Sequence, residues 1–288
     1  MLIEKLDLVF TGANQRRSKY DVIYPENDAK LPLLIFCHGF KGFKDWGHFP
    51  LICNQLAAAG QAVVKFNFSH NGLSIDSNYD FDDLNAFAEN NYLKELQDIN
   101  LLIDLLQKDQ SLRDRIDFNN ISILGHSRGG STAILAGLSD PKIKRIITWA
   151  AVADLRERLP ADPELDVWRE KGVRYIPNGR TGQNMPMHYQ FVDTLMTNLE
   201  RLSIELQIKG SDKPLLIIHG EIDQAVPLEH AYALKVWQPN ADLECIADAG
   251  HTFGGAHPFQ GNELPLHTRK AVEVTLNFLK SHSGLRSG

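Results

Sequence analysis

A serine between two glycines lies near the middle of the chain, where residues 125–129 have the sequence GHSRG, the pattern G-x-S-x-G around Ser127. A short apolar segment, 121–124, precedes this pattern, and small residues suited to a helix follow it. A strand, a tight turn and a helix form the context in which such a serine acts as a nucleophile. Glycines flank the serine because side chains there would collide with neighbouring backbone. Taken alone, the pattern is also compatible with an ordinary glycine-rich turn.

A serine hydroxyl is a weak nucleophile at neutral pH, so it needs a base within hydrogen-bond distance and an acid that orients the base. In folds that carry this serine turn, the order along the chain is serine, then Asp or Glu, then histidine. Asp223 follows a strand-like apolar segment, 214–220, and is the first candidate for the acid. Glu221, closer to that segment, and Asp154, which follows an earlier strand-like segment, are the alternatives.

The candidate base is His251, which follows the last short strand-like segment and has glycine on its N-terminal side. His257 and His267 lie close downstream and are its competitors among the 11 histidines. His38 and His219 each precede a glycine at a strand end, so we expect both to bond to nearby backbone.

Two backbone N–H groups are candidates for an oxyanion hole, which stabilises the negative charge that develops on an attacked carbonyl oxygen. The Phe40 N–H follows His38 and Gly39 at the end of an apolar run, and the Arg128 N–H lies at the predicted helix start after Ser127. The first of these segments is also compatible with an ordinary strand-to-loop turn. All four segments occur in the required order, each at the carboxyl end of a predicted strand, and together they favour a serine hydrolase.

Apolar segments alternate with helical patterns through most of the chain. This predicts an α/β fold with a doubly wound, mostly parallel sheet and right-handed crossovers. Strands are predicted over residues 6–11, 19–24, 31–40, 62–68, 121–124, 144–151, 214–220 and 242–247. Helices are predicted over residues 45–60, 91–108, 228–237 and 268–281, and directly after the serine turn.

Residues 154–212 interrupt this alternation and predict a small cap insertion. Strand-like segments at 173–176 and 185–189 flank a turn-rich stretch and predict a hairpin, and a stripe of apolar residues predicts a helix over 191–202. An insertion after a strand lies at the carboxyl edge of the sheet, where ligands bind. The alternative is a peripheral decoration away from the site. Six large side chains are expected to line a pocket: Trp168, Tyr175, Met185, Met187, Tyr189 and Phe191.

Composition favours a single globular domain over residues 1–288. With a net charge of −6, the chain lacks the excess of basic residues that is typical of nucleic-acid-binding proteins. No apolar run reaches the roughly 18–20 residues that span a bilayer. Three widely spaced cysteines, Cys37, Cys53 and Cys245, form no disulfide framework or zinc pattern, and we expect them to act as small buried hydrophobes. The N-terminal residues lack the core of a signal peptide, so the expected compartment is the cytoplasm.

Four segments of this sequence resemble those of the α/β-hydrolase superfamily: HGF at 38–40, GHSRGG at 125–130, HGEIDQAVP at 219–227 and AGHTF at 249–253. The chain looks most similar to dienelactone-hydrolase-like and prolyl-oligopeptidase-like esterases, including cinnamoyl (feruloyl) esterases, over most of residues 30–282. The resemblance implies Ser127 as nucleophile, His251 as base, Asp223 as acid, and the N–H groups of Phe40 and Arg128 as oxyanion hole. Dienelactone hydrolases use a cysteine nucleophile, so the serine here argues against that particular reaction.

The expected function is a serine-dependent carboxylic-ester hydrolase that acts on a small-molecule ester with a small or medium acyl group. No metal and no organic cofactor are required by this chemistry. A thioesterase, an acyltransferase or a small peptidase would use the same residues. A non-catalytic binding module is disfavoured, because a binding module has no need of all four segments. The oligomeric state is left open by the sequence.

Overall fold

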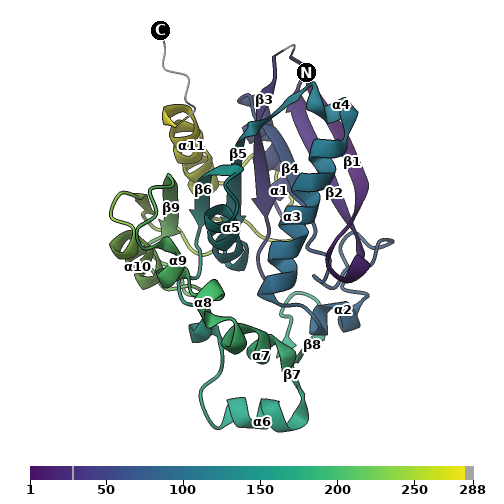
Figure 1. Ribbon diagram of the computed structural model, residues 1–288, viewed down its shortest axis with the longest axis vertical. Helices are drawn as coiled ribbons and strands as arrows, with labels where there is room; N and C mark the ends of the chain where they lie inside the picture. Colours follow the sequence, from purple (N-terminus) through teal and green to yellow (C-terminus); the bar gives the residue numbers. More distant parts are fainter. Residues whose placement is uncertain (28, 283–288) are drawn as a thin grey trace.

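A computed structural model describes residues 1–27 and 29–282 and has an eight-stranded sheet at its centre (Figure 1). The strand order is β1-β2-β4-β3-β5-β6-β9-β10. All neighbours from β4 to β10 are parallel, and β1 and β2 form an antiparallel edge. The predicted α/β fold is therefore confirmed. The strands are β1 Leu2–Thr11, β2 Arg17–Pro25, β3 Leu31–Cys37, β4 Ala62–Phe66, β5 Ile116–His126, β6 Ile143–Trp149, β9 Leu215–Gly220 and β10 Asp242–Ile246.

Helices cover both faces of the sheet (Figure 1). On one face lie α1 (Phe49–Ala58) and α11 (Leu266–Ser281), and on the other lie α3 (Tyr92–Lys108), α5 (Arg128–Ser139) and α10 (Glu229–Trp237). Helix α1 begins later than predicted, because Pro50 suits a first helical turn and Trp46 belongs to the preceding loop. Two short helices, α2 (Leu84–Ala88) and α4 (Gln110–Arg113), were not predicted.

Strand β3 illustrates why a continuous apolar run forms a central strand. Successive side chains point to opposite faces of a sheet. Leu33 and Ile35 accordingly pack into the core under α3 and α5, whereas Leu34 and Phe36 pack into the core under α1 and α11. All four side chains are fully buried. Helices on both faces thus account for an apolar run without alternation.

The insertion between β6 and β9 occupies the lower end of the molecule in Figure 1. It contains the predicted hairpin as an antiparallel pair in which Ile176 lies opposite Met185. The predicted helix over 191–202 is two helices, because Asn198 has non-helical backbone angles, φ −120° and ψ 28°. The elements of the insertion are η2 Leu155–Arg158, α6 Glu164–Lys171, β7 Val173–Pro177, β8 Asn184–His188, α7 Gln190–Thr197, α8 Leu199–Leu202 and α9 Ile204–Ile208.

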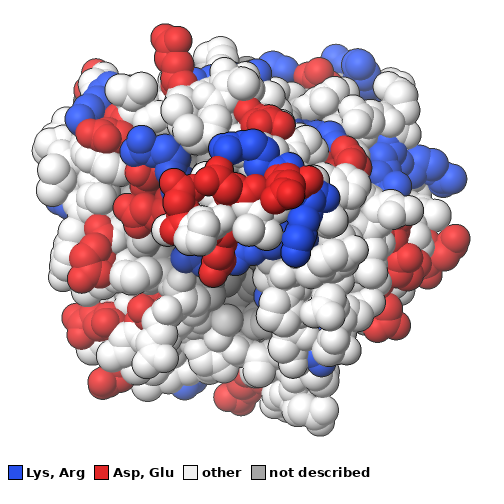
Figure 2. All heavy atoms as spheres, turned by 90° about the horizontal axis from the view of Figure 1, so that it is seen from below, with Lys and Arg blue, Asp and Glu red and all other residues white. Residues whose placement is uncertain are grey.

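Helix α6 is the least predictable element of the insertion. Trp168 is its one buried residue, so the sequence carries no apolar stripe of helical period there. Its remaining side chains are largely charged and exposed. Figure 2 looks onto this end of the molecule, where acidic and basic side chains lie close together and a mostly uncharged hollow opens beside them.

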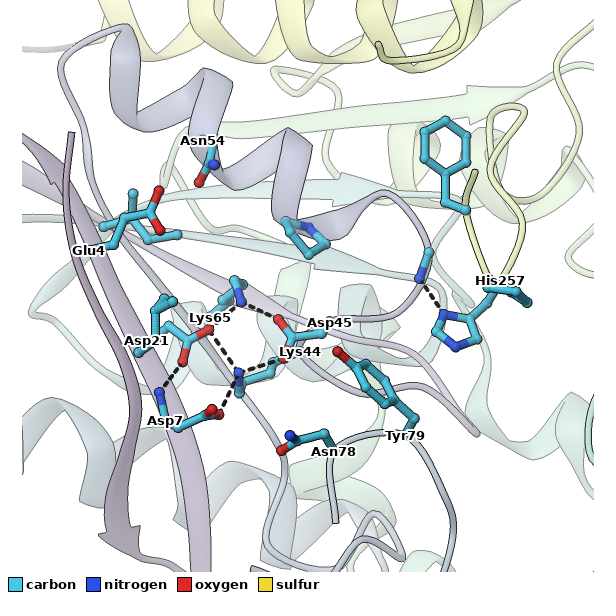
Figure 3. A pocket seen from close by; sticks show the side chains of 16 residues that line it. Glu4, Asp7, Asp21, Lys44, Asp45, Asn54, Lys65, Asn78, Tyr79 and His257 are labelled. Atoms are coloured by element: carbon cyan, nitrogen blue, oxygen red, sulfur yellow. Dashed lines mark hydrogen bonds and ion pairs between the residues drawn. The ribbon is translucent and has the colours of Figure 1, made fainter. Parts of the chain in front are cut away.

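A cluster of buried ions lies between the antiparallel edge of the sheet and the loop before α1 (Figure 3). The Nζ of Lys44 lies 2.8 Å from Asp21, 2.6 Å from Asp45 and 3.1 Å from Asp7, and Lys65 pairs with Asp21 and Asp45. Burial would raise the pKa of Asp45, but the two ammonium groups lower it overall. These charges are each other's counterions, which is how buried charges are tolerated. Because the residues are distant in sequence, no motif indicates the cluster.

The three cysteines are free, and two of them match the expectation. Cys37 and Cys53 are fully buried. Cys245 is half-buried, so its predicted role as a buried hydrophobe is wrong. It lies on β10, the edge strand, where the thiol bonds to the exposed Tyr232 and burial is the main cause that raises its pKa.

Within the part of the chain that the structure describes, no helix is both long enough and apolar enough to cross a bilayer.

Four buried histidines should make this fold sensitive to acid. Burial lowers the pKa of His38, His48 and His70 to about 4, and that of His126 to about 3. The unfolded chain takes up protons on these groups near pH 6.5, so their contribution to stability is full above that pH and is lost as the pH falls toward 4. We expect the free energy of unfolding in urea to fall between pH 7.5 and pH 5.5, by ~1 kcal/mol for each histidine.

The variant His70→Gln should reduce this difference by ~1 kcal/mol, because this group no longer takes up a proton when the chain unfolds. Equal stability at the two pH values in the wild-type protein would contradict the prediction.

Candidate active site

Ser127 lies on a strained turn between β5 and α5. Its backbone angles are φ 56° and ψ −123°, a conformation that residues other than glycine rarely adopt. A Cβ on Gly125 would lie 2.1 Å from the carbonyl oxygen of Gly129. A Cβ on Gly129 would lie 2.4 Å from the carbonyl oxygens of Cys37 and His38. Both glycines are therefore required for the steric reason that the sequence suggested.

The loop after β3 packs directly against this serine. A Cβ on Gly39 would lie 3.0 Å from the Cβ of Ser127, so any larger residue here would require the serine turn to shift by a few tenths of an ångström. Phe40 follows and lines the same two cavities as Ser127. Arg128 is the first residue of α5, and N–H groups in a first helical turn have no acceptor within the helix. The N–H groups of Phe40 and Arg128 thus belong to the two segments that meet at the serine.

Asp223 and His251, far apart in sequence, meet at the carboxyl edge of the sheet. The Nδ1–H of His251 donates to Oδ2 of Asp223 at 2.8 Å. The backbone N–H groups of Ala225 and Val226 donate to Oδ1 at 2.8 and 2.9 Å. Burial raises the pKa of Asp223, but these hydrogen bonds outweigh it and lower the pKa overall. The carboxylate therefore stays ionised and holds the imidazole with Nε2 available as an acceptor.

The two other acids considered from the sequence lie elsewhere. Glu221 is exposed at the start of the loop, whereas Asp223 is buried. The carboxylate of Asp154 lies 2.7 Å from the guanidinium of Arg156 and accepts the backbone N–H of the same residue at 2.9 Å. Of the three candidate acids, Asp223 is therefore the one that contacts His251, and it occupies the buried position of its loop.

The remaining histidines have other partners. His257 accepts the backbone N–H of Gly47 at 2.8 Å through Nδ1, and His267 lies half-buried on α11. His38 and His219 bond to backbone carbonyl oxygens of neighbouring loops at 2.9 and 2.8 Å, so the prediction of local backbone bonds is confirmed.

His126 has a positioning role that the sequence did not indicate. Its Nε2–H donates to the backbone carbonyl oxygen of His251 at 2.8 Å, and the two ring centroids lie 4.8 Å apart. Burial keeps its pKa at about 3, so the ring is neutral at physiological pH. The hydrogen bond ties the loop of His251 to the residue before the serine. A single sequence offers no signal for this contact, because the position is the variable one of G-x-S-x-G.

Two cavities open beside the serine, and Phe40, Lys41, Ser127 and His251 line both. The first, of about 250 Å³, is walled by the loops around His251 and is called the histidine-side cavity. The second, of about 350 Å³, reaches α3, α5 and the insertion and is called the cap-side cavity. A larger cavity of about 530 Å³ lies over the buried ions and shares only His257 with the histidine-side cavity (Figure 3).

The expectation that six large residues of the insertion line a pocket is largely wrong. Met187 and Phe191 do line the cap-side cavity, and Ile176 joins them. The other four do not line either cavity beside the serine. Trp168 and Met185 fill the interior of the insertion, Tyr175 is 60% exposed on the hairpin, and Tyr189 packs against Arg169 with its ring 5.4 Å from the guanidinium. Alternation along the hairpin accounts for Tyr175, whose side chain lies on the opposite face from those of Ile176, Met185 and Met187.

Over residues 1–27 and 29–282, no group of three His, Cys, Asp or Glu side chains is placed to hold a metal ion.

Comparison with known proteins identifies both a matching family and similar solved structures. The model of the alpha/beta hydrolase family matches residues 34–261. A solved structure of Est1E from Butyrivibrio proteoclasticus with ferulic acid bound is similar, with a TM-score of 0.72 and 22% identity over 96% of this chain and 99% of that one. The resemblance stated from the sequence is thereby confirmed.

Curated relatives match over shorter stretches. An uncharacterised 31.7 kDa protein of Escherichia coli is 29% identical over 133 residues, which cover 45% of this chain and 41% of that protein. The 2-hydroxymuconate semialdehyde hydrolase of Pseudomonas putida is 24% identical over 163 residues, 48% of this chain and 58% of that protein. The matched part thus spans less than two thirds of each relative.

The arrangement predicts that Ser127 is reactive and that its reactivity depends on Asp223. A fluorophosphonate probe should label the wild-type protein at Ser127, followed by mass spectrometry of the labelled peptide. Asp223→Asn should slow labelling by orders of magnitude, since loss of the orienting acid in other serine enzymes costs about 10⁴. The matched control Glu221→Gln, two residues away, should label at the wild-type rate. Slow labelling of Asp154→Asn with normal labelling of Asp223→Asn would assign the acid to the loop after β6.

Proposed function

Because the chain belongs to the alpha/beta hydrolase family, we propose that it is a serine hydrolase that cleaves the carboxylic ester of a small or medium acyl group. The observation that carries this proposal is the hydrogen bond from His251 to Asp223 in a protein whose strained Ser127 lines the same two cavities. A binding module would have no use for a strained serine beside an oriented imidazole.

In the proposed reaction, Oγ of Ser127 attacks the ester carbonyl while Nε2 of His251 takes its proton. The oxyanion that forms is stabilised by the N–H groups of Phe40 and Arg128, aided by the positive end of the α5 dipole. The C–O bond to the alcohol breaks, and His251 gives its proton to the leaving oxygen. Water, deprotonated by His251, then attacks the acyl-enzyme and releases the acid and the free serine.

Asp223 supports this cycle without touching the substrate. Its carboxylate fixes the tautomer of His251 and stabilises the imidazolium that forms when the proton arrives. The depressed pKa of Asp223 keeps this charge available over the neutral range. No metal or organic cofactor takes part in these steps. Three free cysteines suit a reducing compartment, which supports the cytoplasm as the proposed location.

We further propose that the insertion over 154–212 is a cap that shapes the pocket for the acyl group. Met187 and Phe191 support this, because they line the cap-side cavity together with Ser127. Thioesters and amides would pass through the same intermediates, so the group that leaves is decided by the walls of the cavities.

The direct test is hydrolysis of 4-nitrophenyl acetate by wild-type protein and by Ser127→Ala. The variant should lose activity by several orders of magnitude, since it removes the nucleophile, and should keep the circular dichroism spectrum and the unfolding midpoint of the wild type. A folded Ser127→Ala protein with near wild-type activity would overturn the proposed function.

A second test addresses the cap. Met187→Ala enlarges the cap-side cavity, so it should change the ratio of kcat/KM between acetyl, butyryl, octanoyl and feruloyl esters. For an acyl group that fits the cavity well, this change should correspond to about 1–3 kcal/mol of transition-state binding free energy. Tyr189→Ala is the matched control, because this residue of the same segment packs on Arg169 outside the cavity. If Met187→Ala scales all four rates equally, the insertion does not select the acyl group.

A further inference from the structure

We propose that the substrate of this enzyme carries a carboxylate at the far end of its acyl group, and that this carboxylate binds to Arg128 and Arg158 in the cap-side cavity. The inference rests on the proposed function and names the class of ester: a monoester of a dicarboxylic acid. Hydrolysis with one water would release the dicarboxylate and the alcohol.

The acyl group is assigned to the cap-side cavity by the route of the proton. The leaving oxygen takes its proton from His251, so the alcohol must depart on the side of the loops that carry this histidine. His251 lines both cavities, but Thr252, its neighbour in the same loop, lines only the histidine-side cavity, so we place the alcohol on that side. The acyl group therefore occupies the cap-side cavity, which extends over α5 toward the insertion.

The charge around the cap-side cavity is of one sign. Lys41, Arg128 and Arg158 line it, and no Asp or Glu is among its lining residues in the described chain. This contrasts with the whole protein, whose net charge is −6. The other walls are largely apolar or aromatic, including Tyr92, Met187 and Phe191. In a cavity with apolar walls, fixed cations attract an anion more strongly than they would in water.

Arg128 supplies the most specific observation, because its guanidinium is buried without enough acceptors. Its side chain is 8% exposed, and Nε forms an ion pair with Oε1 of Glu95 at 2.8 Å. Neither Nε nor Nη2 makes a hydrogen bond of good geometry to a described residue. The contact of Glu95 with this guanidinium is made through Nε, and its oxygens also accept from Asn90 at 2.9 Å and Thr132 at 2.8 Å.

Aromatic rings fix the orientation of this guanidinium. The guanidinium carbon lies 4.3 Å from the ring centroid of Tyr92 and 4.9 Å from that of Phe191. Rings that cover the faces of a guanidinium leave its N–H edge for an acceptor. A carboxylate has the planar geometry to accept from the part of that edge that Arg128 presents to the cap-side cavity.

Arg158 offers a second, adaptable donor at the mouth of the cavity. It is exposed, and Nη1 donates to the carbonyl oxygen of Ala225 at 3.1 Å. Arg156, two residues earlier in the same short helix, instead pairs with Asp154 and lies outside the cap-side cavity. The two arginines therefore form a matched pair for experiment.

The test compares two esters of equal chain length in a pH-stat, monomethyl adipate and methyl hexanoate, which differ in the terminal carboxylate. We expect kcat/KM to be about ten-fold or more higher for monomethyl adipate, as charge-assisted hydrogen bonds allow, and the preference to shrink as salt is added. Arg158→Gln should lower the preference for monomethyl adipate over methyl hexanoate about ten-fold, whereas Arg156→Gln should leave both rates unchanged.

A binding measurement removes the dependence on turnover. Titration calorimetry with the Ser127→Ala protein should detect adipate and should show weaker binding to hexanoate. The double variant Glu95→Gln/Arg128→Gln, which leaves no unpaired buried charge, should lose the adipate signal.

The outcomes separate the inference from the proposed function. Methyl hexanoate hydrolysed as fast as monomethyl adipate, with adipate bound no better than hexanoate, overturns the inference and leaves the hydrolase intact. So does a preference for a carboxylate on the alcohol side, tested with 5-acetoxypentanoate against pentyl acetate. No hydrolysis of any ester together with no fluorophosphonate adduct at Ser127 overturns the proposed function, and the inference fails with it.

Discussion

The close approach of two backbone segments at Gly129 is the contact on which the rest of the site depends. The N-terminus of α5 lies so near the end of β3 that a single methyl group on this glycine would collide with two carbonyl oxygens, those of Cys37 and His38. Because of this approach, Ser127 is held on a strained turn beside the loop that carries Phe40. Eight strands and the helices on both faces hold the two segments there and compensate for the strain.

Burial decides the charge state of most groups near this contact. Desolvation keeps His38 and His126 neutral, so each can donate one hydrogen bond to a backbone carbonyl without adding a positive charge beside His251. Asp223 is buried as well, yet three hydrogen bonds lower its pKa. The ionised carboxylate of Asp223, with the neutral rings of His38 and His126 in the same low-dielectric region, favours proton transfer to His251.

Charge is distributed differently on the two sides of the molecule's interior. In the cluster of Lys44 and Lys65 with Asp21 and Asp45, the two ammonium groups and the two carboxylates pair with each other. Around Ser127 the basic side chains face the cap-side cavity with one buried acid, Glu95, behind them. The charge of Arg128 is paired with Glu95, but a buried guanidinium N–H without a hydrogen-bond acceptor costs free energy, and such a cost is typical of a binding site.

The sheet, its long helices, the hairpin of the insertion and the meeting of Asp223 with His251 were all predictable from the amino-acid sequence. Apolar runs, helical periodicity and glycine-flanked turns are local properties of a chain, and parallel strands bring their carboxyl ends to one edge of the sheet. The short helices α2, α4, α6 and α9 and the break at Asn198 were not predictable, because such short segments carry no extended apolar pattern. Cys245 is half-buried because β10 is an edge strand, which the local sequence does not reveal. Three further features depend on the packing of whole elements: which side chains of the insertion line the cap-side cavity, the bond from His126 to the loop of His251, and the burial of Arg128 between Tyr92 and Phe191. These contacts join residues far apart in the chain, and their geometry depends on how whole elements pack.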